Sequence, residues 1–258
     1  MSEAAGPLVR IERRGDVAIL WMDDARRRNA LSTALVREML DAIAAGGRDG
    51  AGAFVLASDQ KAFCAGADIR DMLDNGWLEA DQNDLAVLTP PDLFKAIEAE
   101  PRPVIAAVNG PALGGGVELC LACDLAIAGP PASFMLPELG LGILPNTAIA
   151  RLPALIGYRR AADLILTRRK VDAAEALALG LVTMLADDPV GQAVATAAAL
   201  CASVPPVALA AAKRNLSRGR TWAEADGMLR QMDGREWREG VSAFLEKRTP
   251  DYGRYRKD

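Results

Sequence analysis

Histidine is absent from this 258-residue sequence. Serine triads and papain-like dyads normally use an imidazole base, and most catalytic zinc and iron sites use imidazole ligands. The absence argues against all of these classes, and we expect no metal site. Any chemistry then has to be carried by carboxylates, backbone dipoles or lysines.

Long apolar runs and a strong net charge are also missing. No run reaches the roughly 18 apolar residues that a membrane helix needs. The first ten residues, MSEAAGPLVR, lack the apolar core of a signal peptide. The formal net charge of -4 argues against a nucleic acid as a partner of the whole chain. We expect a soluble, cytoplasmic protein with neither a membrane nor a nucleic-acid partner.

Cysteine is scarce, with four residues in apolar surroundings: Cys64, Cys120, Cys123 and Cys201. Cys120 and Cys123 have the spacing of a redox or metal-binding pair, but no second such pair and no histidine completes a metal site. We interpret all four as buried structural thiols. A redox role for the pair is the alternative.

The chain is 51% hydrophobic and 25% charged, and it is long enough to bury one sizeable core. Apolar runs predict strands at residues 9–12, 17–22, 53–57, 103–108, 125–128 and 133–135. Helical patterns lie at 31–44, with Ser32 as its cap, at 69–73 and at 92–99. This alternation indicates an α/β layer fold in which ligand groups gather at the strand ends.

The last part of the chain is almost wholly helical in pattern. Helices are predicted at residues 193–203, 206–218, 222–239 and 241–246. We therefore expect an α/β core domain over residues 1–193 and a helical C-terminal region over residues 194–258.

The most informative segment covers residues 103–124 and reads PVIAAVNGPALGGGVELCLACD. It predicts a buried strand, a turn with three consecutive glycines, and a helix with Glu118 near its start. Glycines let a ligand approach bare backbone N–H groups, and a helix N-terminus adds donors and the positive end of a dipole. The segment predicts an oxyanion site. The alternative is a tight turn for packing a helix on a sheet.

A second strand-to-helix loop, KAFCAGADI at residues 61–69, also places small residues where backbone must come close to a ligand. Charge that develops on a thioester oxygen is best stabilised by preorganised dipoles. Two N–H donors from separate loops suit that task. Together the two loops predict an oxyanion hole for an enolate or a tetrahedral intermediate.

Four motifs resemble those of the enoyl-CoA hydratase/isomerase (crotonase) superfamily: KAFCAGADI, PVIAAVNGPALGGGVELCLACDLAIA, FMLPELGLGILP and EGVSAFLEKR. The resemblance spans residues 17–248, with the motifs in the family's order. It implies a crotonase-like spiral of ββα turns with a helical C-terminal trimerisation region. It also implies a homotrimer or a dimer of trimers, and a role in fatty acid metabolism.

The same resemblance implies a site for an acyl-CoA thioester. The backbone N–H groups of Ala67 and Gly115 would form the oxyanion hole. The other positions that it assigns are Ala65, Asp68 and Ile69 around the adenine; Arg27, Arg28 and Lys61 near the phosphates; Gly114, Pro145 and Asn146 elsewhere in the substrate site; and Phe244 and Lys247 from a neighbouring subunit. For the arginines, a solvated turn is the alternative.

Glu118 and Glu138 match the two glutamates of family hydratases. Apolar surroundings raise the pKa of a carboxyl group, and a close carboxylate raises it further, so one of a pair can hold a proton while the other acts as base. The implied reaction is syn hydration of a 2-enoyl-CoA to a 3-hydroxyacyl-CoA. Glu118 would deprotonate the water at the β carbon and Glu138 would exchange the proton at the α carbon. Coenzyme A enters as part of the substrate, and no permanently bound cofactor is expected.

One segment departs from the family pattern. Family hydratases have a glycine-rich stretch after the proline, whereas this chain reads LPNTAIARL over residues 144–152 and is one residue shorter. Asn146 and Thr147 could move the catalytic water or narrow the acyl channel. Two other functions stay open: a Δ3,Δ2-enoyl-CoA isomerase or related lyase that uses Glu138, and a non-catalytic acyl-CoA-binding member. The acyl group depends on residues 74–88, whose conformation the sequence does not determine.

Overall fold

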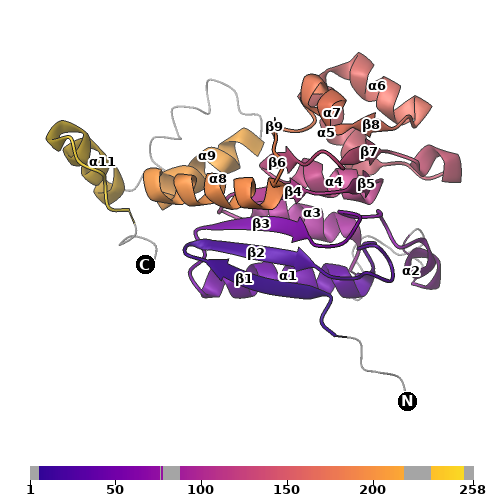
Figure 1. Ribbon diagram of the computed structural model, residues 1–258, viewed down its shortest axis with the longest axis horizontal. Coiled ribbons are helices and arrows are strands. Elements are labelled where there is room, and N and C mark those ends of the chain that lie inside the picture. The colour runs from indigo at the N-terminus through magenta and orange to yellow at the C-terminus, as the bar shows by residue number, and fades with distance from the viewer. Residues whose placement is uncertain (1–5, 76, 78–87, 218–233, 253–258) are drawn as a thin grey trace.

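The computed structural model describes residues 6–75, 77, 88–217 and 234–252 of the chain. Helices and parallel strands alternate through most of this length, and they form a larger sheet with a smaller one beside it (Figure 1). The mixed α/β class predicted from the sequence is confirmed.

The larger sheet, in the described part of the chain, has the strand order β1-β2-β3-β4-β6-β9. Its strands are β1 (Val9–Arg14), β2 (Val17–Met22), β3 (Ala53–Ser58), β4 (Val104–Val108), β6 (Leu125–Ala128) and β9 (Met184–Leu185). Strands β1 and β2 form an antiparallel hairpin, and the others pair in parallel. Every residue of β3 and β4 is buried, which is typical of central parallel strands covered on both faces.

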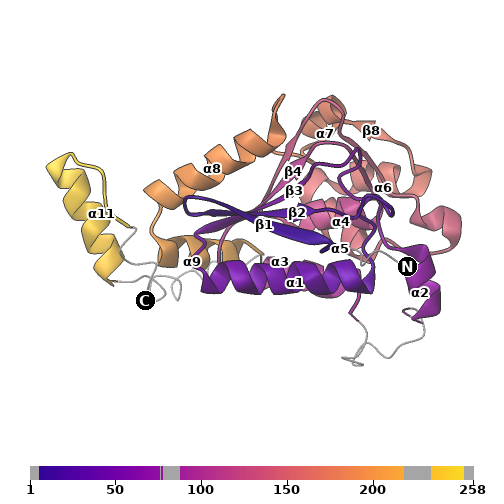
Figure 2. The same ribbon diagram turned by 60° about the horizontal axis from the view of Figure 1, so that its bottom comes forward.

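Helices cover both faces of this sheet. Helices α1 (Thr33–Arg48) and α3 (Pro90–Ala99) lie on one face and α8 (Pro189–Ser203) on the other (Figure 2). The sheet separates two apolar cores, because successive side chains of a strand point to opposite faces. In β3, Phe54 and Leu56 pack on the α1 and α3 side, and Val55 and Ala57 pack under α8. The sheet therefore holds its strand ends, and the loops that follow them, on a rigid base.

The smaller sheet and its helices extend the apolar core on the α1 and α3 side of the larger sheet, with Ala112, Phe134 and Val171 in the same cluster as Phe54. Its strands are β5 (Pro111–Leu113), β7 (Ser133–Met135) and β8 (Val171–Asp172). The neighbouring elements are α4 (Gly115–Ala122), the 3-10 helix η1 (Glu138–Leu141), α5 (Asn146–Ile156), α6 (Tyr158–Thr167) and α7 (Ala173–Leu179). The short helix α2 (Ile69–Asp74) follows β3 at the edge of the molecule (Figure 1).

The C-terminal part contains α9 (Pro206–Ser217) and α11 (Gly234–Glu246). Buried Lys213 attaches α9 to the core: its Nζ lies 2.7 Å from Asp124 Oδ2 and donates to the carbonyl oxygens of Ile97 and Arg102, each at 3.0 Å. In contrast, α11 stands apart from both sheets in Figures 1 and 2.

Two further findings concern α8 and α9. Among the described residues, no single helix has the length and apolar composition needed to cross a membrane, although α8 and α9 together, bent by 117°, meet that test. The boundary proposed after residue 193 falls inside α8, whose Ala193 and Ala197 pack against the sheet. The division into two regions stays a prediction.

Most predicted elements of the first half lie within two residues of their observed positions. Ser32 caps α1 by accepting a hydrogen bond from Leu35 N at 3.2 Å, although that helix runs to Arg48. The predicted break at Gly240 is wrong, because α11 continues through it. A side chain at that position would lie 2.6 Å from the Tyr252 hydroxyl, so the glycine permits a close contact instead of ending the helix. Most of residues 74–88, and the first part of the helix predicted at 222–239, lie outside the described residues.

Candidate active site

The two loops predicted to approach a ligand lie against each other at the carboxyl ends of β3 and β5. Leu113 N donates to Cys64 O at 3.0 Å, and single bridges pair Cys64 with Ala112 and Leu31 with Ala67. Gly66 has a φ of +97°, and a Cβ there would lie 2.7 Å from Leu113 O. Only glycine fits this conformation and this contact, so the close approach of the loops explains the small residues.

The backbone N atoms of Ala67 and Gly115 lie close together where these loops meet. A Cβ on Gly115 would lie 3.2 Å from Ala67 N, and one on Gly66 would lie 3.3 Å from Gly115 N. In the described part of the chain, neither N–H donates to a protein acceptor. Gly115 is also the first residue of α4, so the positive end of the helix dipole adds to the two donors. The predicted pair of oxyanion donors is brought together in the structure.

Glu118 lies in the first turn of α4 and reaches the first turn of α5. Its Oε1 accepts hydrogen bonds from Thr147 N at 2.8 Å and from Ala148 N at 3.1 Å. Burial raises the pKa of Glu118 above its ordinary value, and the two N–H donors oppose that rise by stabilising the charged form. Glu118 is therefore a partly buried carboxylate whose one oxygen is fixed in direction.

Glu138 follows β7 as the first residue of η1, and its environment differs. Within the described residues its Oε2 is buried and has no hydrogen-bond partner. Burial raises the pKa of Glu138 to about 7, its own backbone N–H opposes this, and the charge of Glu118 adds to the rise. The two glutamates thus differ: two N–H groups of α5 hold Glu118, whereas Glu138 has only its own backbone N–H as a donor and its Oε2 has none among the described residues.

Gly114 explains how Glu138 comes so close to the oxyanion donors. It has a φ of +51°, and a Cβ there would overlap the Glu138 carboxylate. The absence of a side chain at Gly114 therefore leaves space for the Glu138 carboxylate. The sequence predicts Gly114 in the substrate site but does not predict this role.

Comparison with known proteins identifies the family. A model of the enoyl-CoA hydratase/isomerase family matches residues 12–255. The chain belongs to that family. A 2,3-dehydroadipyl-CoA hydratase of Escherichia coli is 34% identical over 252 residues, covering 94% of this chain and 97% of that protein.

Solved structures agree with the sequence comparison. An enoyl-CoA hydratase from Bacillus anthracis is 33% identical with a TM-score of 0.83, covering 95% of this chain and 98% of that one. Another from Mycobacterium smegmatis is 30% identical with a TM-score of 0.82, covering 96% and 100%. These neighbours confirm the crotonase-like fold, and the family is one of enzymes.

Most residues that the crotonase resemblance assigns to CoA lie in or around the loop of residues 61–69, which carries Ala67 and is called the oxyanion loop below. Arg27 Nε lies 3.4 Å from Asp68 Oδ2, and Asp68 caps α2. Ala65 N donates to Arg28 O at 3.0 Å. Lys61, in the same loop, is exposed, and Ile69, the first residue of α2, is 45% exposed. The structure brings this group together at one edge of the site.

Asn29 is a site residue that sequence reasoning missed. It is fully buried: its Oδ1 accepts from Asp24 N at 2.8 Å, and its Nδ2 donates to Ser58 Oγ at 2.8 Å and to Phe63 O at 3.1 Å. Arg28 and Asn29 both have a positive φ, at 54° and 56°. Asparagine tolerates this conformation better than most residues. Its side chain thus links the segment of residues 26–28, the arginine loop, to the oxyanion loop.

The remaining predicted positions fall in two places: Pro145 and Asn146 lie directly before Thr147, which donates to Glu118, and Phe244 and Lys247 lie in or just after α11. Pro145 is buried and precedes α5, and Asn146 is exposed as its first residue. Phe244 lies in α11 with its side chain outside the described part, and exposed Lys247 follows that helix. Because α11 and α2 lie at opposite ends of the molecule in Figure 1, the chain's own α11 does not bring these two positions to the CoA-site residues on α2.

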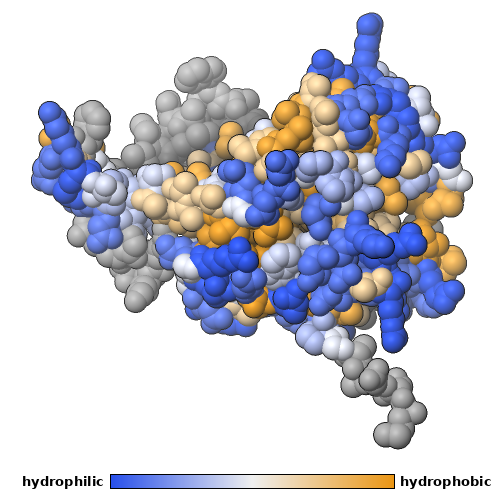
Figure 3. Space-filling model, in the orientation of Figure 1, coloured by the Kyte–Doolittle hydropathy of each residue, from blue (hydrophilic) through white to orange (hydrophobic). Residues whose placement is uncertain are grey.

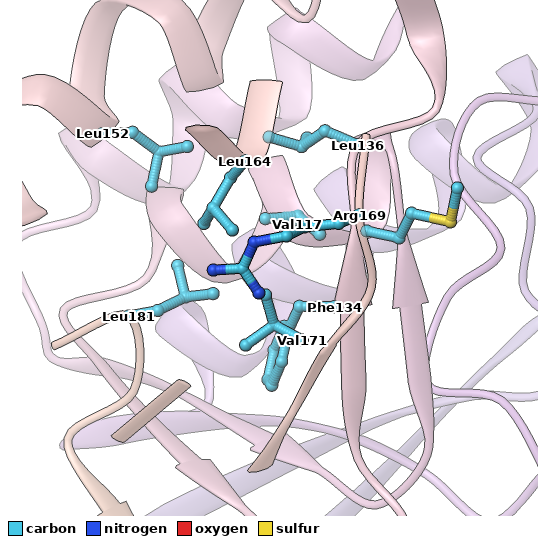
Figure 4. Close-up of a pocket in the computed structure, with 9 residues that line it drawn as sticks. Val117, Phe134, Leu136, Leu152, Leu164, Arg169, Val171 and Leu181 are labelled. Atoms are coloured by element: carbon cyan, nitrogen blue, oxygen red, sulfur yellow. The ribbon is translucent and has the colours of Figure 1, made fainter. Parts of the chain in front are cut away.

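Large apolar side chains are exposed on segments that carry predicted site residues: Leu73 on α2, and Leu141 and Leu144 after Glu138. Figure 3 shows hydrophobic surface on the side where α2 lies. A small cavity behind α4 is lined by Val117, Leu152, Leu164 and five further apolar residues (Figure 4). Arg169 extends into this cavity and pairs with Asp163 and Glu175, each at 2.7 Å. Neither Glu118 nor Glu138 lines the cavity, so we interpret it as core packing.

The four cysteines are free thiols. Cys64, Cys120 and Cys201 are buried, as predicted, and Cys123 is partly buried. Burial raises the pKa of the Cys64 thiol to about 12 and raises those of Cys120 and Cys123 as well. Thiols with such pKa values react slowly, which favours a structural role over a redox one.

Proposed function

We propose that this enzyme adds water reversibly and with syn geometry to a 2-enoyl-CoA thioester, giving a 3-hydroxyacyl-CoA. One observation carries the proposal: two partly buried carboxyl groups, one held by N–H donors and one with an unpartnered oxygen, lie beside two neighbouring N–H groups that have no acceptor in the described residues. Hydration needs a base, an acid and a place for the enolate oxygen. This arrangement offers all three.

The two glutamates divide the acid and base roles. The N–H groups of Thr147 and Ala148 favour the ionised form of Glu118, so Glu118 takes a proton from water as the oxygen bonds to the β carbon. The electron pair of the double bond moves to the thioester oxygen, which Ala67 N and Gly115 N stabilise. Glu138, with a pKa near 7, then gives a proton to the α carbon. Proton exchange with water resets both carboxyl groups.

Coenzyme A binds as part of the substrate in this proposal. Arg27, Arg28 and Lys61 would meet its phosphates, and Ala65, Asp68 and Ile69 would border the adenine. The ion pair between Arg27 and Asp68 supports this, since it holds a half-exposed guanidinium at the edge of the oxyanion loop.

The position of α11, away from both sheets of its own chain in Figures 1 and 2, supports assembly as a homotrimer or a dimer of trimers. Phe244 and Lys247 would then complete the CoA site of a neighbouring subunit, since α11 stands apart from the sheets of its own chain. The cytoplasmic location and a role in fatty acid metabolism are likewise proposals, which rest on the sequence.

A Δ3,Δ2-enoyl-CoA isomerase is the second candidate. It needs the same oxyanion hole and one carboxyl group that moves a proton between carbons. Glu138 suits this task, because its Oε2 has no partner among the described residues and its pKa lies near neutrality. The two hydrogen bonds that orient Glu118 have no use in that reaction, and they favour hydration.

The unmodified protein distinguishes the candidates. Turnover of crotonyl-CoA and of 3-hexenoyl-CoA is measured side by side, with a wider panel of CoA thioesters behind them. Hydration predicts that kcat/KM for crotonyl-CoA, or for another 2-enoyl-CoA of the panel, exceeds that for every 3-enoyl-CoA. The opposite order supports the isomerase, and tight binding without turnover of any thioester supports a non-catalytic member.

A further inference from the structure

The first turn of α5 has a catalytic duty in the proposed reaction, since its N–H groups hold Glu118. Arg151, one turn further along, is the only charged residue of this helix. Its guanidinium pairs with the Glu98 carboxylate on α3. Helices α3 and α5 both pack against α4, the helix that carries Glu118. Glu118 therefore connects α4 to α5, the ion pair connects α5 to α3, and packing connects α3 back to α4.

We propose that Glu98 and Arg151 are positioning residues that hold the first turn of α5 at hydrogen-bond distance from Glu118. The inference rests on the proposed role of Glu118 as base. Neither side chain touches the oxyanion donors, and both are about one third exposed, at 32% for Arg151 and 29% for Glu98.

Apolar packing of Ala148 and Leu152 holds α5 against the core, but its start has few polar contacts that would fix its exact position. The preceding residues turn at Gly142, which has a positive φ of 73° and open space around it. Pro145, at the N-cap position, offers no side-chain cap, so Glu118 itself supplies the acceptor for the first turn. Pro153 interrupts the hydrogen bonding of the helix further on. We therefore expect loss of the Arg151 contact to let the first turn shift by a small distance, enough to weaken its hydrogen bonds to Glu118.

A direct electrostatic effect on Glu118 is the alternative, and it has a different signature. The charged and titratable groups on the elements packed against α4 are Asp92, Lys95 and Glu98 of α3 and Arg151 of α5; Glu138 of η1 also acts on the pair. Removing the positive charge of Arg151 would disfavour ionised Glu118, whereas removing the negative charge of Glu98 would favour it. Direct effects thus have opposite signs. Loss of position weakens the same two hydrogen bonds in either variant, so its effects have the same sign.

The test measures crotonyl-CoA hydration from pH 5 to 9 for Glu98→Gln, Arg151→Met and the double variant. Arg14→Met is the control, because Arg14 forms an exposed pair with Glu12 at 2.7 Å on β1. We expect kcat at pH 7 to fall by about three- to tenfold in each variant and in the double variant alike, with KM changed less than about twofold. The acid limb of the kcat profile should move to higher pH in both single variants. The control should match the unmodified enzyme.

Three results would overturn the inference: limbs that move in opposite directions, an acid limb that stays in place while only the melting temperature falls, or losses that add in the double variant. If the single variants fail to fold, the exchanged variant Glu98→Arg/Arg151→Glu decides, since a positioning pair predicts recovery of kcat and of the acid limb. The parent proposal is judged separately. If Glu118→Gln still hydrates crotonyl-CoA, the role of Glu118 as base is refuted. If Glu118→Gln is inactive but the acid limb of the kcat profile does not move in the Glu98 and Arg151 variants, only the positioning role of that pair is refuted.

Discussion

Gly114 lies against Glu138, so that a Cβ at this position, and with it any side chain, would overlap the carboxylate. The first glycine of the run thus makes room for the proposed acid, and the second, Gly115, would supply a donor of the proposed oxyanion hole. The run, interpreted from the sequence as a single anion site, therefore has two separate roles in the proposed reaction.

Substitution of Gly114 tests this relationship. In Gly114→Ala, the methyl group displaces Glu138 and the φ of +51° becomes strained. We expect kcat for hydration to fall by about a hundredfold or more, because a misplaced acid loses its alignment with the α carbon. Gly15→Ala is the control for a positive φ: Gly15 has a φ of +59°, and a Cβ there would have nothing within 4 Å. Equal activity losses in the two variants would refute the claim that Gly114 leaves space for the Glu138 carboxylate.

The pH dependence of activity should reflect both glutamates. Glu138 has to hold a proton, and its pKa is raised to about 7 by burial, so kcat should decline as the pH rises above 7. Glu118 has to be ionised, so kcat should also decline at acid pH. A rate profile over pH 5 to 9 that stays flat above pH 8 would contradict the assignment of Glu138 as the acid.

The raised pKa of Glu138 also predicts a cost in stability. Its folded pKa near 7 lies above the ordinary 4.5, so the favourable contribution of the protonated form is complete below 4.5 and is lost as the pH rises through 7. Glu138→Gln should therefore raise the free energy of unfolding at pH 8 by about 1 kcal/mol, allowing for the partial exposure of the group. The gain should vanish near pH 4.5. Denaturant melts at the two pH values measure it, and an equal change at both would contradict the prediction.

Asn29 should matter for both stability and substrate binding. Asn29→Ala leaves buried groups without partners and puts alanine at a φ of 56°, which costs about 2 to 4 kcal/mol in all. Asn29→Gly relieves the backbone strain but not the lost hydrogen bonds, so it should be destabilised less. We expect KM for crotonyl-CoA to rise in both variants as the arginine loop loosens. Melts and steady-state kinetics within error of the unmodified enzyme would show that this loop does not depend on Asn29.

Lys213 should anchor α9. Lys213→Met removes the cation from Asp124 and the donor from two backbone carbonyl groups, which should cost about 2 to 3 kcal/mol. Lys95→Met on exposed α3 surface is the control and should change stability by less than about 0.5 kcal/mol. A Lys213 variant as stable as the control would mean that the ion pair does not hold α9 to the core.

The sequence predicted those features that depend on local pattern. Buried strands such as β3, the Ser32 cap and the two small-residue loops all follow from residues close together in the chain. The paired donors Ala67 and Gly115 followed from the character of those loops together with the family resemblance. The mixed α/β class followed from the alternation of strands and helices.

Features that depend on distant partners were missed. The start of α5 has no cap in its own sequence, since its acceptor is Glu118, 29 residues earlier. Asn29 looks like an ordinary turn residue until Ser58 and Phe63 are placed beside it. The sequence alone predicts a helix end at Gly240, because the contact with Tyr252 that explains this glycine joins separate segments. In each case the deciding interaction is tertiary.

The rate of crotonyl-CoA hydration by Glu118→Gln tests the central claim most directly. Glutamine keeps the shape and the acceptor oxygen that Thr147 and Ala148 contact, but it cannot take a proton from water. The account predicts that kcat falls by about a hundred- to ten-thousandfold, while binding of a non-reactive CoA thioester and the melting temperature stay close to those of the unmodified enzyme. A kcat within about threefold of the unmodified value, with exposed Glu12→Gln as control, would contradict the account.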